Sequence, residues 1–165
     1  MLAVLVSVAA LAPYSQPPSL KAVGGLAGCW KALGQVRGKD ATSVARGSWH
    51  LGGRYFVLQL KSVTPGRPYE AAISYGAGEK PNEIGSFWAD TFGGLYQPSL
   101  GLGRTTVDGF LQEYRFTDAL YVNRFKRTAT GWTWTIVEQA AGKPDKLFAR
   151  YDLNRTGCGR IRFDF

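Results

Sequence analysis

The chain has 165 residues, of which 45% are hydrophobic and only 19% are charged, with 21 glycines and a net charge of +8. This composition is typical of one globular domain large enough to bury a core, and it excludes a disordered chain. Because no apolar stretch approaches the roughly 18 to 20 residues that span a bilayer, we expect no transmembrane segment in the mature protein.

The N-terminal stretch differs from the rest of the chain. Residues 2–12 are apolar apart from Ser7, end in small residues and precede several prolines. Such a run is typical of the apolar part of a secretory signal peptide. We therefore expect residues 1–12 to be a signal peptide, residues 13–25 to be a linker, and the protein to be periplasmic or secreted. A buried N-terminal segment is the alternative.

The two cysteines agree with export. Cys29 lies in the first predicted strand, and Cys158 lies between two glycines near the C-terminal end. A disulfide would tie the end of the chain to its first strand, which the loop-entropy model values at about 4 to 5 kcal/mol. Since disulfides persist in oxidising compartments, we predict this disulfide on condition of export, with two buried free thiols as the alternative. Together with one histidine, the cysteines offer too few ligands for a structural zinc site.

Strand patterns recur about every 10 to 12 residues, separated by turn signals such as Gly52-Gly53 and Asp108-Gly109. Many antiparallel strands with short connections close most economically as an up-and-down barrel, which leaves no free edge. We therefore predict an all-β fold with a single barrel of about ten strands over residues 26–165. The predicted strands are 27–36, 43–51, 54–63, 69–76, 84–92, 101–107, 110–117, 119–128, 132–139 and 146–153, with an optional edge strand at 160–163.

Side-chain alternation predicts which residues face the interior. Aromatic residues such as Trp88 and Trp134 fall on one face of their strands, whereas basic residues such as Arg124 fall on the other. Aromatic walls with a few polar groups are typical of small-molecule cavities, and a filled core is the alternative. The predicted ligand-binding residues are Tyr55, Tyr75, Trp88, Asp90, Tyr114, Tyr121, Asn123 and Trp134.

Three short motifs resemble known barrel families. The segment LAGCW at 26–30 is similar to the Leu-x-Gly-x-Trp entry of calycin-type barrels. The segment FWADTFGG at 87–94 resembles the Trp-x-Asp-x-x-Gly step of a bacterial lipocalin-like family of unknown function. The segment GGRYF at 52–56 fits the pattern of a glycine, an aromatic residue and a strand in that family. The resemblance covers residues 26–153 and implies an exported ten-stranded barrel without an established activity.

The resemblance extends distantly to the nitrobindins, which bind haem through a histidine near the C-terminal end of the barrel. The single histidine of this chain, His50, lies in the second predicted strand, and alternation places it outside if Trp49 faces in. The matching haem ligand is therefore missing. Tyrosine can also ligate haem, but no tyrosine is singled out. We predict no haem, no other cofactor and no metal.

Three functions stay open. The first, which we favour, is a barrel that binds a small apolar or amphipathic molecule. The second is an enzyme that uses the same pocket, with Asp90 or His50 inside it beside a second titratable group such as Glu113. The third is a structural or surface-interaction protein with a filled interior. It predicts one contiguous basic patch on the outside, formed by Arg124, Lys126, Arg150, Arg155, Arg160 and Arg162.

Several common activities lack their motifs. The sequence has no phosphate-binding loop, no dinucleotide fingerprint and no Gly-x-Ser-x-Gly elbow, so we assign no catalytic residues. Proteins that bind single-stranded nucleic acid need exposed aromatic side chains among their basic residues. Here the aromatic residues alternate away from the basic ones, so we do not expect a nucleic-acid partner.

Overall fold

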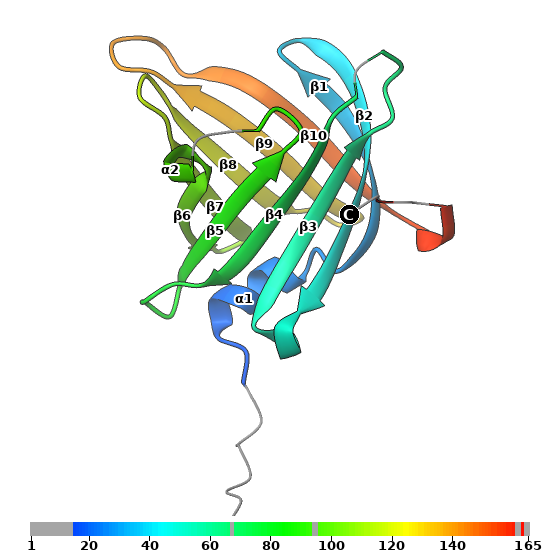
Figure 1. The fold of residues 1–165 in the computed structure, drawn as a ribbon, viewed down its shortest axis with the longest axis vertical. Coiled ribbons are helices and arrows are strands. Elements are labelled where there is room, and N and C mark those ends of the chain that lie inside the picture. Colours follow the sequence, from blue (N-terminus) through cyan, green and yellow to red (C-terminus); the bar gives the residue numbers. More distant parts are fainter. Residues whose placement is uncertain (1–14, 67, 94–95, 161–162, 164–165) are drawn as a thin grey trace, which may run out of the picture.

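The barrel is closed. The computed structural model describes residues 15–66, 68–93, 96–160 and 163, and its ten antiparallel strands follow the order β1-β10-β9-β8-β7-β6-β5-β4-β3-β2, with β2 pairing back to β1 (Figure 1). The predicted all-β barrel of about ten strands is confirmed. The strands are β1 (Gly28–Val36), β2 (Lys39–His50), β3 (Tyr55–Ser62), β4 (Glu70–Ala77), β5 (Glu83–Asp90), β6 (Leu100–Thr106), β7 (Gly109–Arg115), β8 (Leu120–Arg127), β9 (Gly131–Gln139) and β10 (Lys146–Thr156).

The boundary that differs most from the prediction is the start of the second strand. It begins at Lys39 rather than at residue 43, because Arg37 and Gly38 form a two-residue turn with φ of 50° and 72°. Positive φ at both central residues is the geometry that continues a hairpin without splaying its strands. The predicted signal peptide lies outside the described residues. So does most of the optional edge strand at 160–163, where Arg160 ends the short helix η2 (Cys158–Arg160).

The segment predicted as a linker at 13–25 is instead partly helical. Helix α1 (Pro18–Gly24) begins with proline, whose fixed φ suits the first position of a helix. Its residues Leu20 and Val23 are three apart, so they share one face, and both are 0% exposed. In Figure 1 this helix lies across the lower end of the barrel. The prediction missed it because one short helix without a capping side chain gives almost no periodic signal.

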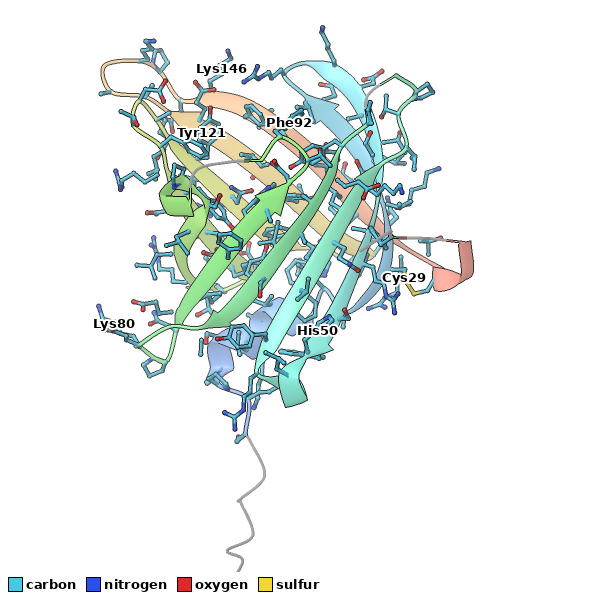
Figure 2. All side chains as sticks on the ribbon, in the orientation of Figure 1. Cys29, His50, Lys80, Phe92, Tyr121 and Lys146 are labelled. Atoms are coloured by element: carbon cyan, nitrogen blue, oxygen red, sulfur yellow. A yellow bond between two sulfur atoms is a disulfide. The ribbon has the colours of Figure 1, made fainter. Side chains whose placement is uncertain are left out.

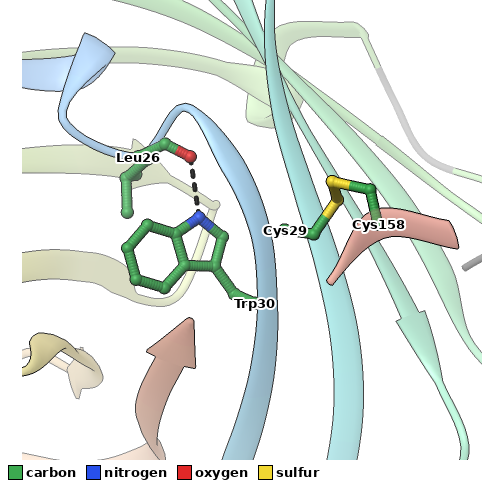
Figure 3. Close-up of a disulfide and its surroundings, with 4 residues drawn as sticks. All are labelled: Leu26, Cys29, Trp30 and Cys158. Carbon is green, nitrogen blue, oxygen red and sulfur yellow. Dashed lines mark hydrogen bonds between the residues drawn. A yellow bond between two sulfur atoms is a disulfide. The ribbon is translucent and has the colours of Figure 1, made fainter. Parts of the chain in front are cut away.

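Two indole groups attach this helix to the barrel. Trp30 Nε1 donates a hydrogen bond of 2.8 Å to the carbonyl of Leu26, as Figure 3 shows. Trp132 Nε1 donates one of 3.2 Å to the carbonyl of Gly25. Both carbonyls lie just after α1, whose own last carbonyls already accept hydrogen bonds from the backbone N–H groups that follow. The tryptophans therefore satisfy the carbonyls of Gly25 and Leu26 and hold the helix against the strands.

The predicted disulfide is confirmed. Cys29 in β1 and Cys158 in η2 are joined, with their Cα atoms 5.3 Å apart (Figure 3). The bridge fastens the chain after β10 to the strand that opens the barrel.

The half of the barrel next to α1 is filled with side chains. Phe110 and Phe125 stack with their ring centroids 4.7 Å apart, and Tyr75 meets Phe110 edge-on at 5.7 Å. These side chains and their neighbours Phe56 and Ile73 are at most 1% exposed. Within the described part of the chain, no helix is long and apolar enough to cross a membrane.

Candidate functional site

The half of the barrel away from α1 contains a cavity of about 790 Å³. Small-molecule sites typically measure roughly 300 to 1,000 Å³. The cavity opens between the β1–β2, β3–β4, β5–β6 and β7–β8 connections, which contribute Arg37, Thr64, Phe92 and Asp118 to its wall. Figure 2 shows Phe92 at this open end, whereas His50 lies at the other end.

The cavity exists because its two sides differ in side-chain size. On one side, β2 contributes the small residues Ala41 and Ser43, and β10 contributes Ala149 beside the larger Tyr151. On the other side stand the large rings of Trp88, Tyr114 and Trp134. Trp88 meets Tyr114 edge-on at a centroid distance of 5.5 Å and lies 5.8 Å from Trp134. The rings therefore support one another as a wall, and the small residues opposite leave the space in front of it open.

The structure brings six of the eight predicted ligand-binding residues to the cavity wall, and two lie elsewhere. Tyr55 is 44% exposed on the outside of β3, because its neighbour Phe56 faces inward. Tyr75 faces inward but belongs to the filled half near α1. The six residues in the wall are Trp88, Asp90, Tyr114, Tyr121, Asn123 and Trp134.

Asp90 is held by three hydrogen bonds near the open end. Its Oδ2 accepts from Tyr69 OH at 3.2 Å and from Trp88 Nε1 at 3.2 Å, and its Oδ1 accepts from the backbone N–H of Phe92 at 3.0 Å. Hydrogen bonds to a carboxylate are among the stronger ones in proteins. Asp90 therefore fixes the orientation of two aromatic side chains in the wall.

A second polar group, Asn123, lies deeper. On β8 the inward positions run from Tyr121 at the open end through Asn123 to Phe125, which belongs to the filled half. Trp134 Nε1 donates a hydrogen bond of 3.0 Å to Asn123 Oδ1. Asn123 is only 3% exposed, so its amide forms part of the cavity floor.

A chain of hydrogen bonds lies behind Tyr114. Gln112 Nε2 donates to the carbonyl of Ile84 at 3.2 Å, so Gln112 Oε1 is the acceptor for the Ser86 hydroxyl at 3.3 Å. Since the single proton of Ser86 is then used, the Tyr114 hydroxyl donates to Ser86 Oγ over 2.9 Å. The Tyr114 proton therefore points into the protein.

Burial raises the pKa of several phenols in this region. Desolvation raises the pKa of Tyr69, with a further contribution from the charge of Asp90. Desolvation also raises the pKa of Tyr114. The pKa of Tyr151 is raised by desolvation and lowered in part by its hydrogen bond with Ser43. These hydroxyls are therefore protonated at neutral pH and act as hydrogen-bonding groups.

Other residues in the cavity wall were not among the predicted ligand-binding residues. Tyr69 and Tyr151 fall on inward faces by alternation, but nothing in the sequence gave their depth along the barrel. Phe148 breaks the alternation, because a register shift between Leu147 and Ala149 turns it toward the cavity beside Ala149. Its ring meets Tyr121 edge-on at 5.4 Å. Only the structure could place it there.

The charged groups considered for catalysis do not gather in the cavity. Glu113 faces the outside of β7, where its carboxylate lies 4.0 Å from the guanidinium of Arg104. His50 is exposed and contacts Ser48 at 2.9 Å. Asp90 therefore has neither of them beside it. Among the described residues, no group of three or more histidine, cysteine, aspartate or glutamate side chains could hold a metal ion.

The basic residues predicted for the outer face are exposed where the structure describes them. Arg124 on β8 and Arg150 on β10 flank the same residue of β9, Thr135. Two of the basic groups have acidic partners: Lys126 lies 3.2 Å from Asp108, and Arg150 lies 3.8 Å from Asp152. Another, Arg155, lies over the ring of Trp30. The Arg160 side chain and Arg162 lie outside the described part.

Comparison with known proteins supports the fold alone. No family model matches the chain, and no curated protein matches it. Among solved structures, the crystal structure of Rv2717c from M. tuberculosis is similar, with a TM-score of 0.57 and 16% sequence identity. The match covers 86% of this chain and 99% of that chain. At this identity, the similarity shows a shared barrel fold and nothing about a ligand.

Proposed function

We propose that the protein is an exported, lipocalin-like barrel that binds a small hydrophobic or amphipathic molecule in its cavity. The observation that carries this proposal is the cavity of about 790 Å³ behind an aromatic wall. The disulfide between Cys29 and Cys158 supports export, because such bonds persist in oxidising compartments.

The wall offers a ligand mostly apolar surface. Burying about 200 Å² of apolar ligand surface against rings such as Trp88 and Trp134 would contribute roughly 5 kcal/mol, before the entropy cost of binding. If an amphipathic ligand has a strongly hydrated end, that end would face the open end. There, Asp90, Asp118 and Arg37 lie among the residues that line the cavity.

The two alternative functions have weaker support. A structural protein with a filled interior would need side chains to fill the whole barrel. They fill the half next to α1, but the other half contains the cavity. An enzyme would need a second acid or base near Asp90, and the titratable group that contacts it is Tyr69, a phenol whose pKa is raised. Lys126 and Arg150, two of the exposed basic residues, are already paired with aspartates. These pairs reduce the positive potential of the outer face and therefore its attraction for an anionic partner.

Two measurements test the proposal. Native mass spectrometry of the protein purified from an exported fraction should show a small molecule that is lost on denaturation. The apo protein should bind N-phenyl-1-naphthylamine, a neutral aromatic dye, with saturable enhancement of its fluorescence. If the mass is bare and the dye does not bind, the proposed function is wrong.

A further inference from the structure

The Asn123 amide has a defined orientation in the cavity floor. An indole N–H can donate a hydrogen bond but cannot accept one. The atom that Trp134 Nε1 contacts at 3.0 Å is therefore the oxygen of the Asn123 amide. The NH₂ group of Asn123, with its two donors, occupies the other position.

This NH₂ group lacks a protein acceptor. The hydrogen bonds of the described residues include none from Asn123 Nδ2. Within the described part of the chain, the buried side-chain polar atom that is both sealed off and unpartnered is Ser19 Oγ, in α1. Asn123 Nδ2 is therefore not sealed off. Since Asn123 lines the cavity and is 3% exposed, the open space that its NH₂ group reaches is the cavity.

Three aromatic donors in the same wall are already used. Tyr69 and Trp88 both donate to Asp90, and Tyr114 donates to Ser86. A ligand acceptor placed against a donor that faces the cavity forms a hydrogen bond that a purely apolar ligand cannot form. The Asn123 amide is therefore a donor in this wall that is open to a ligand acceptor.

The depth of Asn123 also bears on the charge of that acceptor. The charged residues that line the cavity are Arg37, Asp90 and Asp118, in the β1–β2 turn, at the end of β5 and in the β7–β8 connection. All three belong to the open end, so no cation lines the floor in the described structure. Burying an anion without a cationic partner is costly, whereas a neutral carbonyl needs only a donor.

We propose that Asn123 anchors the ligand, and that the ligand is an uncharged molecule whose carbonyl-type oxygen enters the barrel first. This inference rests on the proposed function and narrows its ligand class. The apolar body of such a molecule lies along the rings of Trp88 and Tyr114, with its oxygen at Asn123 Nδ2.

The test compares two flat probes of the same skeleton, 9-fluorenone and fluorene, which differ in one carbonyl oxygen. The readout is the ratio of their affinities, measured by quenching of tryptophan fluorescence. Asn123→Leu combined with Trp134→Phe removes donor and acceptor together, so neither partner is left unpaired. Trp134→Phe alone is the matched control, because it keeps the Asn123 NH₂ group.

We expect the double variant to prefer the ketone about five- to tenfold less strongly than Trp134→Phe alone does, the usual range for one neutral hydrogen bond. If the double variant does not fold, Asn123→Asp keeps the acceptor for Trp134, replaces the NH₂ group and should lower the same ratio. Equal ratios in all variants would overturn the role of Asn123 while leaving a binding barrel intact. Failure of both probes and of the naphthylamine dye to bind the wild type would overturn the proposed function as well.

Discussion

Trp88 and Asp90 lie two residues apart on the inward face of β5, and the indole N–H of Trp88 donates a hydrogen bond of 3.2 Å to Asp90 Oδ2. The same oxygen accepts a hydrogen bond from the hydroxyl of Tyr69, which directly precedes β4. The carboxylate therefore holds two aromatic side chains at the cavity wall, where a shift of either would change its shape. Trp88 is only half-buried, so its ring faces the cavity as well as the protein.

We expect Trp88→Ala to weaken binding more than it lowers stability. Loss of the ring should reduce the affinity for N-phenyl-1-naphthylamine about tenfold, while the free energy of unfolding falls by about 1 kcal/mol, because the ring is only half-buried and one side of it faces the cavity. Fluorescence titration and urea unfolding measure the two effects.

Trp49→Ala is the matched control for this substitution. Trp49 meets Phe56 edge-on at 5.1 Å at the filled end of the barrel. We expect Trp49→Ala to lower the free energy of unfolding by about 3 kcal/mol and to leave the affinity for the dye unchanged. Equal dye affinity of Trp88→Ala and the wild type would show that this wall is not the binding surface.

Alternation along each strand predicted much of the wall, because the side-chain period of two is a local property of the chain. It placed Trp88, Asn123 and Trp134 on inward faces, as the structure does. Alternation does not show how far along the barrel axis a residue lies. It therefore could not distinguish Tyr75, in the filled half, from Tyr114, beside the cavity. Depth depends on which end α1 closes, and that depends on contacts between distant parts of the chain.

Two other features of the site could not be predicted from the sequence, for different reasons. Phe148 reaches the cavity through a register shift that breaks the period of two. The free NH₂ group of Asn123 depends on which atom Trp134 contacts, and Trp134 lies on the neighbouring strand. Alternation gives the face on which a residue lies, but it does not give the partner of a hydrogen bond.

We expect Gly101→Ala to disturb the aromatic wall. Gly101 lies between Ser86 and Tyr114, and a Cβ there would collide with Ser86 Oγ and lie 2.6 Å from Tyr114 Cε1. Overpacking of this kind costs about 1 to 3 kcal/mol. Because Tyr114 must move, the affinity for N-phenyl-1-naphthylamine should fall as well.

Gly85→Ala provides the control on the neighbouring strand. A Cβ on Gly85 would meet no atom within 4 Å. The free energy of unfolding should change by no more than about 0.5 kcal/mol, and dye binding should stay as in the wild type. Similar losses for Gly101→Ala and Gly85→Ala would argue against a specific contact at Gly101.

We expect Leu20→Ala to lower stability without changing the cavity. Leu20 is 0% exposed in α1, so the substitution should cost about 2 to 5 kcal/mol in thermal or urea unfolding. Lys21→Ala, on the exposed side of the same helix, should be nearly neutral. Since the cavity lies in the other half of the barrel, both variants should bind the dye with wild-type affinity. A large loss of affinity in Leu20→Ala alone would mean that α1 also shapes the cavity.

We expect the disulfide to contribute substantially to stability. Cys29 and Cys158 are 129 residues apart, and loss of a native disulfide typically costs about 2 to 5 kcal/mol. The double variant Cys29→Ser, Cys158→Ser should therefore unfold at lower urea concentration, and reduced wild-type protein should behave in the same way. Mass spectrometry after alkylation should find no reactive thiol until the protein is reduced. Two alkylated thiols without reduction would contradict the bridge.

We expect stability to fall in alkaline solution, and Tyr114 to account for a measurable part of the fall. Burial raises the pKa of Tyr114 in the folded state, whereas an unfolded tyrosine has a pKa of about 10. Its contribution is therefore fully present below pH 10 and is lost as the pH rises above that value, since only the unfolded chain then releases the proton. The loss amounts to about 1.4 kcal/mol per pH unit for one such group.

Tyr114→Phe should reduce the slope of unfolding free energy between pH 10 and 12 by this amount, measured by urea unfolding. Identical slopes for Tyr114→Phe and the wild type would show that Tyr114 ionises in the folded barrel as easily as in the unfolded chain.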